Sequence, residues 1–305
     1  MAKLSPLASV SETRAVLEAH GLTTKYSLGQ NFRVNDAILQ KIVALAEVGP
    51  DDAVLEVGPG IGTLTIALLQ HAARVVSVER DPDLPAVLAE TCAPWADRFA
   101  LVEKDALHLA ADDLAALGGF RPGKLVANLP YAVAATVVLD YFERFTSLES
   151  ATVMVQKEVA DRMSAVPGTK SYGAYTVKLR LYAEPAGRFG VGPGNFFPPP
   201  RVESAVVRLN RRTLHGEDGT PLDAATLKAA ATMADAAFAN RRKTLSNSCK
   251  TYFAGRGAEG ARVAAVLPQL FEQAEVDPKL RGEALALEDF IRMGQALSDM
   301  QRRVS

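Results

Sequence analysis

The segment AVLEVGPGIGTLTIALLQHA, residues 53–72, constrains the fold of this chain more than any other stretch. It begins with an apolar run typical of a buried strand, continues through glycines at 58, 60 and 62, and ends with helical spacing. Glycines between a strand and a helix permit a tight turn and allow a ligand to approach the backbone closely. This pattern predicts the first unit of a doubly wound sheet that binds a nucleotide or nucleoside.

The same alternation of strand and helix continues along the chain. Further strands are expected within residues 73–81, 99–107, 124–131 and 151–156, with helices at 82–92, 132–145 and 157–166. Two late strands, at 175–185 and 203–210, are expected to form an antiparallel edge pair. The apolar strands favour a parallel sheet covered on both faces. The predicted fold class is therefore α/β, with a Rossmann-like sheet.

Three regions are expected from the pattern of the sequence. Residues 1–25 form a helical extension, residues 26–213 the Rossmann-like domain, and residues 214–305 a small all-α domain. The segment LHGEDGTPLD, residues 214–223, is the predicted linker, because polar and turn-forming residues dominate it. Beyond it the pattern is helical throughout.

Composition excludes several classes of protein. The net charge of −1 gives no sign of a nucleic-acid partner, and the two cysteines, Cys92 and Cys249, argue against a disulfide framework. The four histidines show no spacing of metal ligands, so no metal is expected. No stretch approaches the roughly 20 apolar residues that cross a bilayer. A cytoplasmic monomer without a membrane partner is expected.

The glycine turn favours S-adenosylmethionine over a dinucleotide. Gly58 and Gly60 begin the usual fingerprint, but Thr63 stands where a dinucleotide site has glycine or alanine. Glu79 ends the second strand, where a carboxylate can accept hydrogen bonds from both ribose hydroxyls. Asp105 follows the third strand, where it can accept a hydrogen bond from the amine of an adenine. A nicotinamide enzyme, or a turn that only packs helix on strand, remains the alternative. Asp105 can equally cap the next segment.

The motif NLPY, residues 128–131, follows the fourth strand at the edge where doubly wound sheets bind their ligands. The amide oxygen of Asn128 and the carbonyl of Leu129 are two acceptors for an exocyclic amine. Pro130 fixes the backbone and withholds a donor. Tyr131 supplies a ring on which a base can stack. A turn in which Pro130 and Tyr131 only pack the sheet edge is the alternative.

Taken together, several motifs resemble the ribosomal RNA adenine N6-dimethyltransferases. They are LGQNF (28–32), EVGPGIG (56–62), VERD (78–81), NLPY (128–131), QKEVADRM (156–163), FFPPPRVESAVVRL (196–209) and NRRKTLSNS (240–248). The last of these resembles the signature of the bacterial small-subunit branch, which dimethylates two adjacent adenosines near the 3′ end of 16S rRNA. The resemblance covers roughly residues 25 to 295.

The resemblance implies a role for individual residues. Asn31 and the backbone at Arg33 would contact the cofactor, and Arg33 stands where many relatives have leucine. Gly58 would approach its methionine part, Glu79 its ribose and Asp105 its adenine. Gly60 is a further cofactor-binding residue of the same turn. Asn128 would serve both the cofactor and the target N6. Tyr131 and Phe196 would sandwich the target adenine, although Phe197 leaves open which phenylalanine stacks.

The resemblance also implies 16S rRNA within the immature 30S subunit as the partner. The target base must leave its stack before it can be methylated. Candidate phosphate contacts are Lys25, Lys170, Arg201, Arg241, Arg242 and Lys243. Two other functions remain open: a ribosome-assembly factor whose methylation is secondary, and a methyltransferase acting on a large-subunit adenine.

Overall fold

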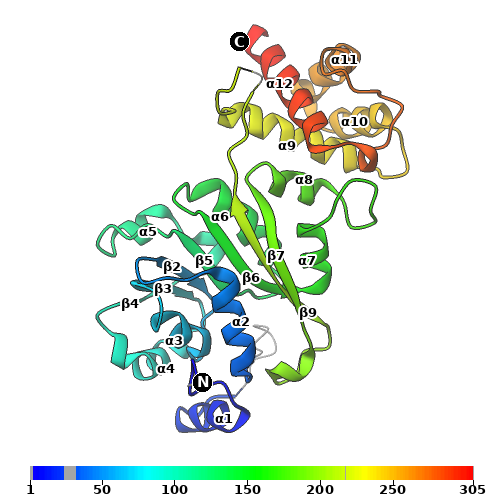
Figure 1. Ribbon diagram of the computed structural model, residues 1–305. Helices are drawn as coiled ribbons and strands as arrows, with labels where there is room; N and C mark the ends of the chain where they lie inside the picture. The colour runs from blue at the N-terminus through cyan, green and yellow to red at the C-terminus, as the bar shows by residue number, and fades with distance from the viewer. Residues whose placement is uncertain (1–2, 24–31, 217, 305) are drawn as a thin grey trace. The chain divides into compact units, whose positions relative to one another are not determined.

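The computed structural model describes residues 3–23, 32–216 and 218–304, and its main feature is a seven-stranded sheet with the order β4-β3-β2-β5-β6-β9-β7 (Figure 1). The strands are β2 (Ala53–Val57), β3 (Arg74–Glu79), β4 (Phe99–Glu103), β5 (Lys124–Asn128), β6 (Ser150–Gln156), β7 (Ala183–Val191) and β9 (Ser204–Arg211). Strands β2 to β6 pair in parallel, and β9 runs antiparallel to β6. A separate antiparallel pair joins β1 (Phe32–Arg33) to β8 (Phe196–Phe197). The predicted α/β fold is confirmed.

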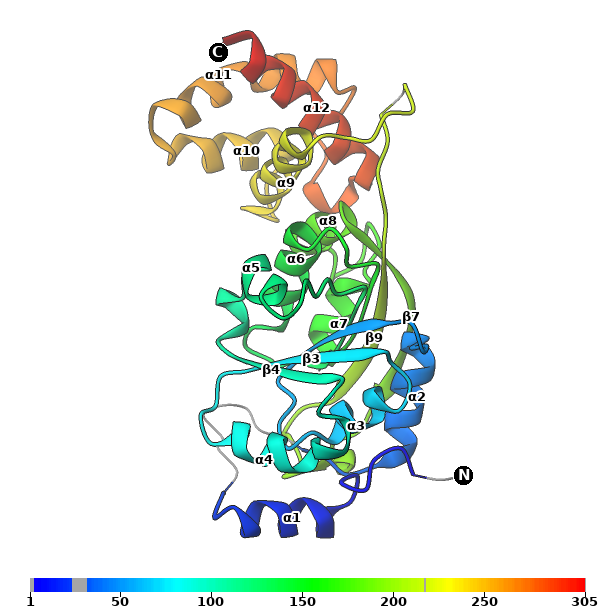
Figure 2. The same cartoon turned by 90° about the vertical axis from the view of Figure 1, so that its left-hand side faces the viewer.

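Helices cover both faces of the large sheet (Figures 1 and 2). One face carries α2 (Asp36–Ala46), α3 (Thr63–Leu69) and α4 (Leu84–Thr91), and the other carries α5 (Ala111–Ala115) and α6 (Ala134–Arg144). Strands β2, β3, β5 and β6 are buried almost throughout, and Val54, Val75 and Val126 are inaccessible to solvent. Burial on both faces explains why these strands read as continuous apolar runs.

The two helices at the start of the chain have residues with capping conformations or contacts at their ends. Helix α1 (Val10–Ala19) is capped by Ser9, and Gly21 follows it with a φ of 63°, the left-handed conformation that ends many helices. Helix α2 is capped by Asn35, whose side chain accepts a hydrogen bond from the amide of Ala37.

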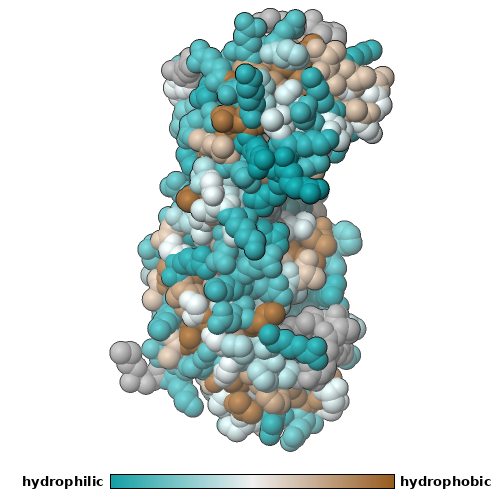
Figure 3. Space-filling view, turned by 90° about the vertical axis from the view of Figure 1, so that its right-hand side faces the viewer, coloured by the Kyte–Doolittle hydropathy of each residue, from teal (hydrophilic) through white to brown (hydrophobic). Residues whose placement is uncertain are grey.

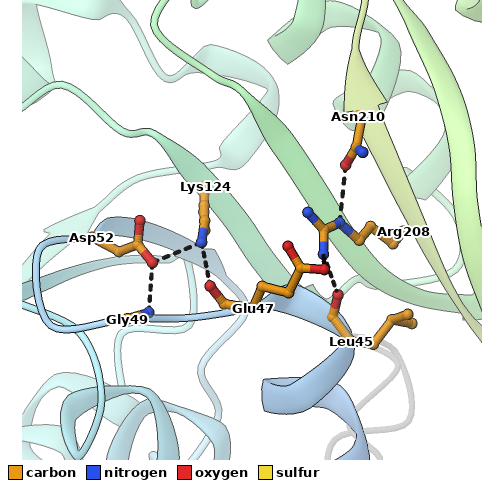
Figure 4. Close-up of polar contacts among 7 residues, drawn as sticks. All are labelled: Leu45, Glu47, Gly49, Asp52, Lys124, Arg208 and Asn210. Atoms are coloured by element: carbon orange, nitrogen blue, oxygen red, sulfur yellow. Dashed lines mark hydrogen bonds and ion pairs between the residues drawn. The ribbon is translucent and has the colours of Figure 1, made fainter.

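The end of α2 is tied to the sheet by a network of polar contacts (Figure 4). Lys124, the first residue of β5, pairs with Asp52 at 2.7 Å and also donates to the carbonyl of Glu47. On β9, Arg208 pairs with Glu47 at 2.6 Å and donates to the carbonyl of Leu45 at 2.9 Å. The hydrogen bond from Arg208 is the main cause that lowers the pKa of the Glu47 carboxyl. Because Lys124 begins its strand, this network lies at the edge of the sheet where the parallel strands start.

One predicted strand is wrong. The β-branched and aromatic residues of 175–185 predict a strand, but the chain forms α8 (Ala174–Arg180) and then β7. Thr176, Val177 and Leu179 are buried in α8, and Lys178 pairs with Asp235 at 2.9 Å. Packing against the later helices therefore overrides the local strand preference.

The described residues divide into two compact units. The first contains residues up to 160 and residues 185–211, and the second contains residues 161–184 and the chain from 212 onward. The expected domain boundary at residue 214 therefore misses 161–184, and the expected extension at the N-terminus groups with the first unit. The reason is that Val177 and Tyr172 belong to the same core as the later helices.

The second unit is helical, as expected for the end of the chain. Its later helices are α9 (Ala224–Phe238), α10 (Leu245–Ala254), α11 (Gly257–Gln273) and α12 (Leu287–Val304). Helices α9 and α12 approach closely, since a Cβ atom at Gly294 would lie 2.7 Å from the Cβ of Ala230. Phe290, Met233 and Leu267 are fully buried in its core.

Two observations concern membranes and the surface in the part of the chain that the structure describes. None of its helices is long and apolar enough to cross a bilayer. The face of the molecule drawn in Figure 3 is predominantly hydrophilic, with apolar residues scattered over it.

Candidate active site

The carboxyl ends of four neighbouring parallel strands bring the predicted cofactor residues into one row. Asp105 follows β4, Glu79 ends β3, Gly58 follows β2 and Asn128 ends β5. Because the sheet has the order β4-β3-β2-β5, these residues follow one another along its edge in the spatial order Asp105, Glu79, Gly58, Asn128. This is the edge at which doubly wound sheets bind ligands.

The glycine turn is in contact with two other motifs. Gly58 has a φ of 68°, and a Cβ atom there would lie 3.6 Å from the backbone oxygen of Asn128 and 3.7 Å from Pro130. Gly60 has a φ of 61°, and a Cβ atom there would lie 3.1 Å from the ring of Phe32. Left-handed φ angles favour glycine at both positions, and a side chain at Gly60 would also crowd the Phe32 ring. The turn therefore contacts the NLPY motif on one side and Phe32, the last residue of LGQNF, on the other.

Glu79 is held by backbone amides at the end of β3. Its Oε1 atom accepts hydrogen bonds of 2.9 Å from the amides of Arg80 and Asp81. Burial is the main cause that raises the pKa of the Glu79 carboxyl, and hydrogen bonds from the amides of Asp81, Arg80 and Gly60 oppose this effect. The carboxylate is thus partly buried and fixed in orientation, which suits a group that binds hydroxyls.

Asp105 caps the segment that follows it, which is the alternative role that the sequence left open. Its Oδ1 atom accepts from the amide of Leu107 at 3.0 Å and so caps a short 3-10 helix, Ala106–His108. Its Oδ2 atom lies 3.2 Å from Nη1 of Arg80. The amide of Leu107 is the first cause that lowers the pKa of the Asp105 carboxyl, and Arg80 adds to it. Asp105 is therefore an ionised carboxylate at the edge of the row, next to Glu79.

The NLPY motif forms a rigid turn between β5 and α6. The amide of Leu129 donates to the carbonyl of Met154 on β6 at 3.1 Å, and the carbonyl of Pro130 accepts from Ala134, the first residue of α6, at 3.1 Å. The hydroxyl of Tyr131 is hydrogen-bonded to that of Ser204 at 2.7 Å. Burial is the main cause that raises the pKa of Tyr131. The loop is therefore fixed at both ends.

The proline-rich segment joins the same site through β8. Phe197 is the register partner of Phe32, and Phe196 is the partner of Arg33. Phe196 is only 3% exposed and belongs to the core cluster that contains Phe32, whereas Phe197 is half-buried. In this position Phe196 offers little surface to a base, so its predicted stacking requires its ring to turn outward. The bond between Phe197 and Pro198 is a cis peptide.

Several predicted site residues lie outside the part of the chain that the structure describes. They are Asn31, Lys25 and the side chain of Arg33, whose backbone pairs with β8. Their predicted roles stay predictions.

Of the residues predicted to bind RNA, Arg241 has a structural partner. Its guanidinium donates to the carbonyls of Lys170 and Tyr172 at 3.0 and 2.8 Å, and it lies 3.6 Å from Glu283. It therefore fastens the loop before α8 to the turn between α9 and α10. Lys170, Arg242 and Lys243 are exposed in the same unit, and Arg201 is exposed in the first unit.

Sequence reasoning missed Phe32, Arg80 and Ser204 as parts of the site. Phe32 and Ser204 stand inside the motifs LGQNF and FFPPPRVESAVVRL, so the motifs signalled them without showing what they contact. Among the described residues, no group of three or more His, Cys, Asp or Glu side chains is placed to hold a metal ion.

Comparison with known proteins identifies one family. The family described as "Ribosomal RNA adenine dimethylase" matches residues 21–290. A protein of Streptomyces coelicolor named ribosomal RNA small subunit methyltransferase A is 42% identical over 290 residues, which cover 93% of this chain and 95% of that protein. A protein of Rhodococcus erythropolis with the same name is 42% identical, over 92% and 91% of the two chains.

Solved structures show the same fold. A dimethyladenosine transferase from Plasmodium falciparum superposes with a TM-score of 0.72 at 22% identity, over 90% of this chain and 98% of that one. The 23S rRNA methyltransferase ErmE superposes with a TM-score of 0.60 at 26% identity, over 88% and 99% of the two chains.

Proposed function

The chain belongs to the ribosomal RNA adenine dimethylase family, and on this basis we propose that it dimethylates N6 of two adjacent adenosines near the 3′ end of 16S rRNA. The methyl donor is S-adenosylmethionine, and the substrate is the immature 30S subunit in the cytoplasm. The observation that carries the proposal is the row Asp105, Glu79, Gly58, Asn128 along the carboxyl edge of the sheet.

The order of this row fits the parts of an adenosyl cofactor. Asp105 would accept from the adenine amine, Glu79 from the ribose hydroxyls, and the backbone at Gly58 would lie against the methionine part. The left-handed turn at Gly58, which has no side chain, and the partly buried carboxylate of Glu79 fit a ligand that needs backbone approach and hydroxyl acceptors. When bound, this cofactor supplies a methyl group on a positively charged sulfur.

The NLPY motif would prepare the target nitrogen. N6 of adenine is a poor nucleophile, because its lone pair is delocalised into the ring. The side-chain oxygen of Asn128 and the carbonyl of Leu129 would accept hydrogen bonds from the amine, which favours a pyramidal nitrogen with its lone pair available. No strong base is needed before attack, because the surplus proton becomes acidic only after methylation. The residues therefore act through position and electrostatics.

The target base would be held by aromatic side chains. Tyr131 is anchored through its hydroxyl to Ser204, which holds the far end of the side chain in place. Phe196 would stack on the other side of the base after leaving the core cluster in which it now lies. Stacking on aromatic rings compensates for the loss of stacking in the RNA.

The choice of the small subunit rests on the relatives. Two proteins named for the small subunit match at 42% identity over more than 90% of this chain, whereas ErmE matches at 26%. The segment NRRKTLSNS supports the same choice.

The test uses purified protein, labelled S-adenosylmethionine, and 30S and 50S particles from cells that lack this modification. We expect label in N6,N6-dimethyladenosine of the 16S rRNA, at two neighbouring positions, and none in the 50S particle. Asn128→Ala should bind 30S particles with unchanged affinity and lose methylation. Label in the 50S particle alone, or methylation that survives in Asn128→Ala, contradicts the proposal.

To separate catalysis from an assembly role, the growth and subunit maturation of a strain with Asn128→Ala are compared with a full deletion. Equal defects support an enzyme whose product matters. A normal phenotype with Asn128→Ala shows that binding alone is the function.

A further inference from the structure

The segment that precedes the LGQNF motif is docked onto the first unit by side-chain contacts. The amide of Leu4 donates to Asp36 at the start of α2 at 2.8 Å, and Gln70 after α3 donates to the carbonyl of Leu4 at 2.6 Å. At the other end of α1, His20 lies 3.2 Å from Glu90 of α4. Figure 2 shows α1 beside α4. Side-chain contacts therefore hold both ends of this segment against the first unit.

One face of α1 is buried. Thr13 is fully buried and Leu17 is 5% exposed, one helical turn apart, and the hydroxyl of Thr13 donates to the carbonyl of Leu7 at 3.2 Å. This packing fixes the rotation of α1 about its axis. It therefore also determines where the exposed residue next to Thr13, Arg14, points.

Arg14 lies over the aromatic segment of the predicted target site. The central carbon of its guanidinium is 4.8 Å from the centroid of the Phe197 ring. Phe197 is adjacent to Phe196, which is expected to stack on the target adenine, and its backbone pairs with Phe32 beside the glycine turn. The helix thus places a positive charge over Phe197, which would form the rim of the target site.

A guanidinium that stacks on a ring keeps its N–H groups available at its edge. Among the contacts of the described residues, the partner of Arg14 is the Phe197 ring, and no carboxylate pairs with it. The planar fork of an arginine matches a phosphate, which it binds through two parallel hydrogen bonds. An RNA strand whose base enters beside Tyr131 and Phe196 carries its phosphates past this rim.

We infer that Arg14 binds a phosphate of the RNA strand next to the target adenosine, with Phe197 as the platform that orients its guanidinium. The inference rests on the proposed function, since it takes RNA as the substrate. It gives the N-terminal helix a part in RNA recognition that no motif in the sequence reveals.

The test compares Arg14→Ala, Arg14→Lys and the control Arg121→Ala, using 30S particles that lack the modification. Arg121 is exposed and precedes β5, so it carries the same charge at the opposite edge of the sheet. For Arg14→Ala we expect the KM for particles to rise at least about 5-fold, and the slope of log affinity against log salt to become shallower by about 1. The kcat and the affinity for S-adenosylmethionine should match the wild type. Arg14→Lys should be intermediate, and Arg121→Ala should behave as the wild type.

Phe197→Leu tests the platform. The effect of Arg14→Ala should be smaller in a Phe197→Leu background than in the wild type, because the ring no longer holds the guanidinium in place. Equal effects in both backgrounds contradict a platform role.

The outcomes separate this inference from the proposed function. A wild-type protein that methylates no particle overturns both. An active wild type with an Arg14→Ala variant that behaves as Arg121→Ala overturns this inference alone. An Arg14→Ala variant that loses cofactor binding as much as RNA binding also overturns this inference alone, because that result indicates a structural role.

Discussion

The hydroxyls of Tyr131 and Ser204 lie 2.7 Å apart and join the loop after β5 to the first residue of β9. The two residues are 73 positions apart in the chain. Burial raises the pKa of Tyr131, so its hydroxyl stays protonated at neutral pH. The bond fixes the position of the hydroxyl end of the ring that is expected to receive the target base.

Ser204→Ala removes this bond while the Tyr131 ring remains. We expect a loss of about 1 kcal/mol in the free energy of unfolding and a kcat several-fold lower, because the ring is less well oriented. The affinity for S-adenosylmethionine should not change. Tyr131→Phe removes the same bond from the other side and should give a matching result, whereas Tyr131→Ala also removes stacking worth about 1–3 kcal/mol. Steady-state kinetics on 30S particles measure all three, and wild-type kinetics for Tyr131→Ala contradict a stacking role.

Gly60→Ala places a Cβ atom 3.1 Å from the Phe32 ring at a φ of 61°. We expect the free energy of unfolding to fall by about 1–2 kcal/mol, and cofactor affinity to fall as well because Phe32 is displaced. Gly119→Ala is the matched control, since Gly119 has a φ of 75° and no atom within 4 Å of the added Cβ. The Gly119→Ala variant should lose a similar amount of unfolding free energy and keep its affinity for S-adenosylmethionine. Calorimetric titration with S-adenosylmethionine and urea unfolding distinguish the two, and equal affinities in both variants contradict the role of the turn.

Glu79→Gln separates stability from cofactor binding. The folded protein holds the proton of this carboxyl more tightly than the unfolded chain does, because burial raises the pKa of Glu79. The unfolding free energy of the wild type should therefore fall as pH rises between the ordinary and the raised pKa, and this contribution should vanish in Glu79→Gln.

Cofactor binding should show the opposite dependence on pH. If the ionised carboxylate accepts the ribose hydroxyls, affinity falls as pH drops through the raised pKa, and Glu79→Gln lowers affinity at neutral pH by roughly 10-fold or more. Glu103→Gln, an exposed residue paired with Glu79 on the next strand, is the control and should resemble the wild type. Unchanged affinity in Glu79→Gln excludes it as a ligand of the ribose.

Two neighbouring arginines in the helical unit, Arg241 and Arg242, should affect different properties: the first stability, the second binding to 30S particles. Arg241→Ala removes hydrogen bonds to the carbonyls of Lys170 and Tyr172, and should cost about 1–2 kcal/mol of stability. Arg242→Ala should change stability by less than about 0.5 kcal/mol. It should weaken binding to 30S particles and reduce the salt slope by about 1. Urea unfolding followed by circular dichroism, together with binding assays at several salt concentrations, checks both, and equal stabilities would contradict the anchoring role of Arg241.

Local sequence could predict the sheet and the positions of the candidate cofactor residues along its edge, for a physical reason. Strands buried on both faces are continuous apolar runs, and a residue that directly follows such a run lies at the ligand edge. Gly58, Glu79, Asp105 and Asn128 could therefore be placed without knowing any contact between distant segments.

The remaining features depend on contacts that local sequence does not encode. Asn35 is hydrogen-bonded to Asn195 across 160 positions, and no local pattern announces the pairing of β1 with β8. Helix α8 carries strand-forming residues, and its packing against the later helices decides its conformation. The anchoring of Arg241 is hidden for the same reason, because a cluster of basic residues looks alike whether it binds RNA or the protein's own carbonyls.

The polypeptide passes between the two compact units three times, near residues 160, 184 and 211. A helical unit attached by a single junction could be exchanged by one recombination event. Here, cutting the gene at the codon for Arg212 would leave Tyr172 and Val177 behind without the helices that bury them. A shortened protein of that kind should aggregate, so the segment from Arg212 onward cannot be exchanged as a self-contained module.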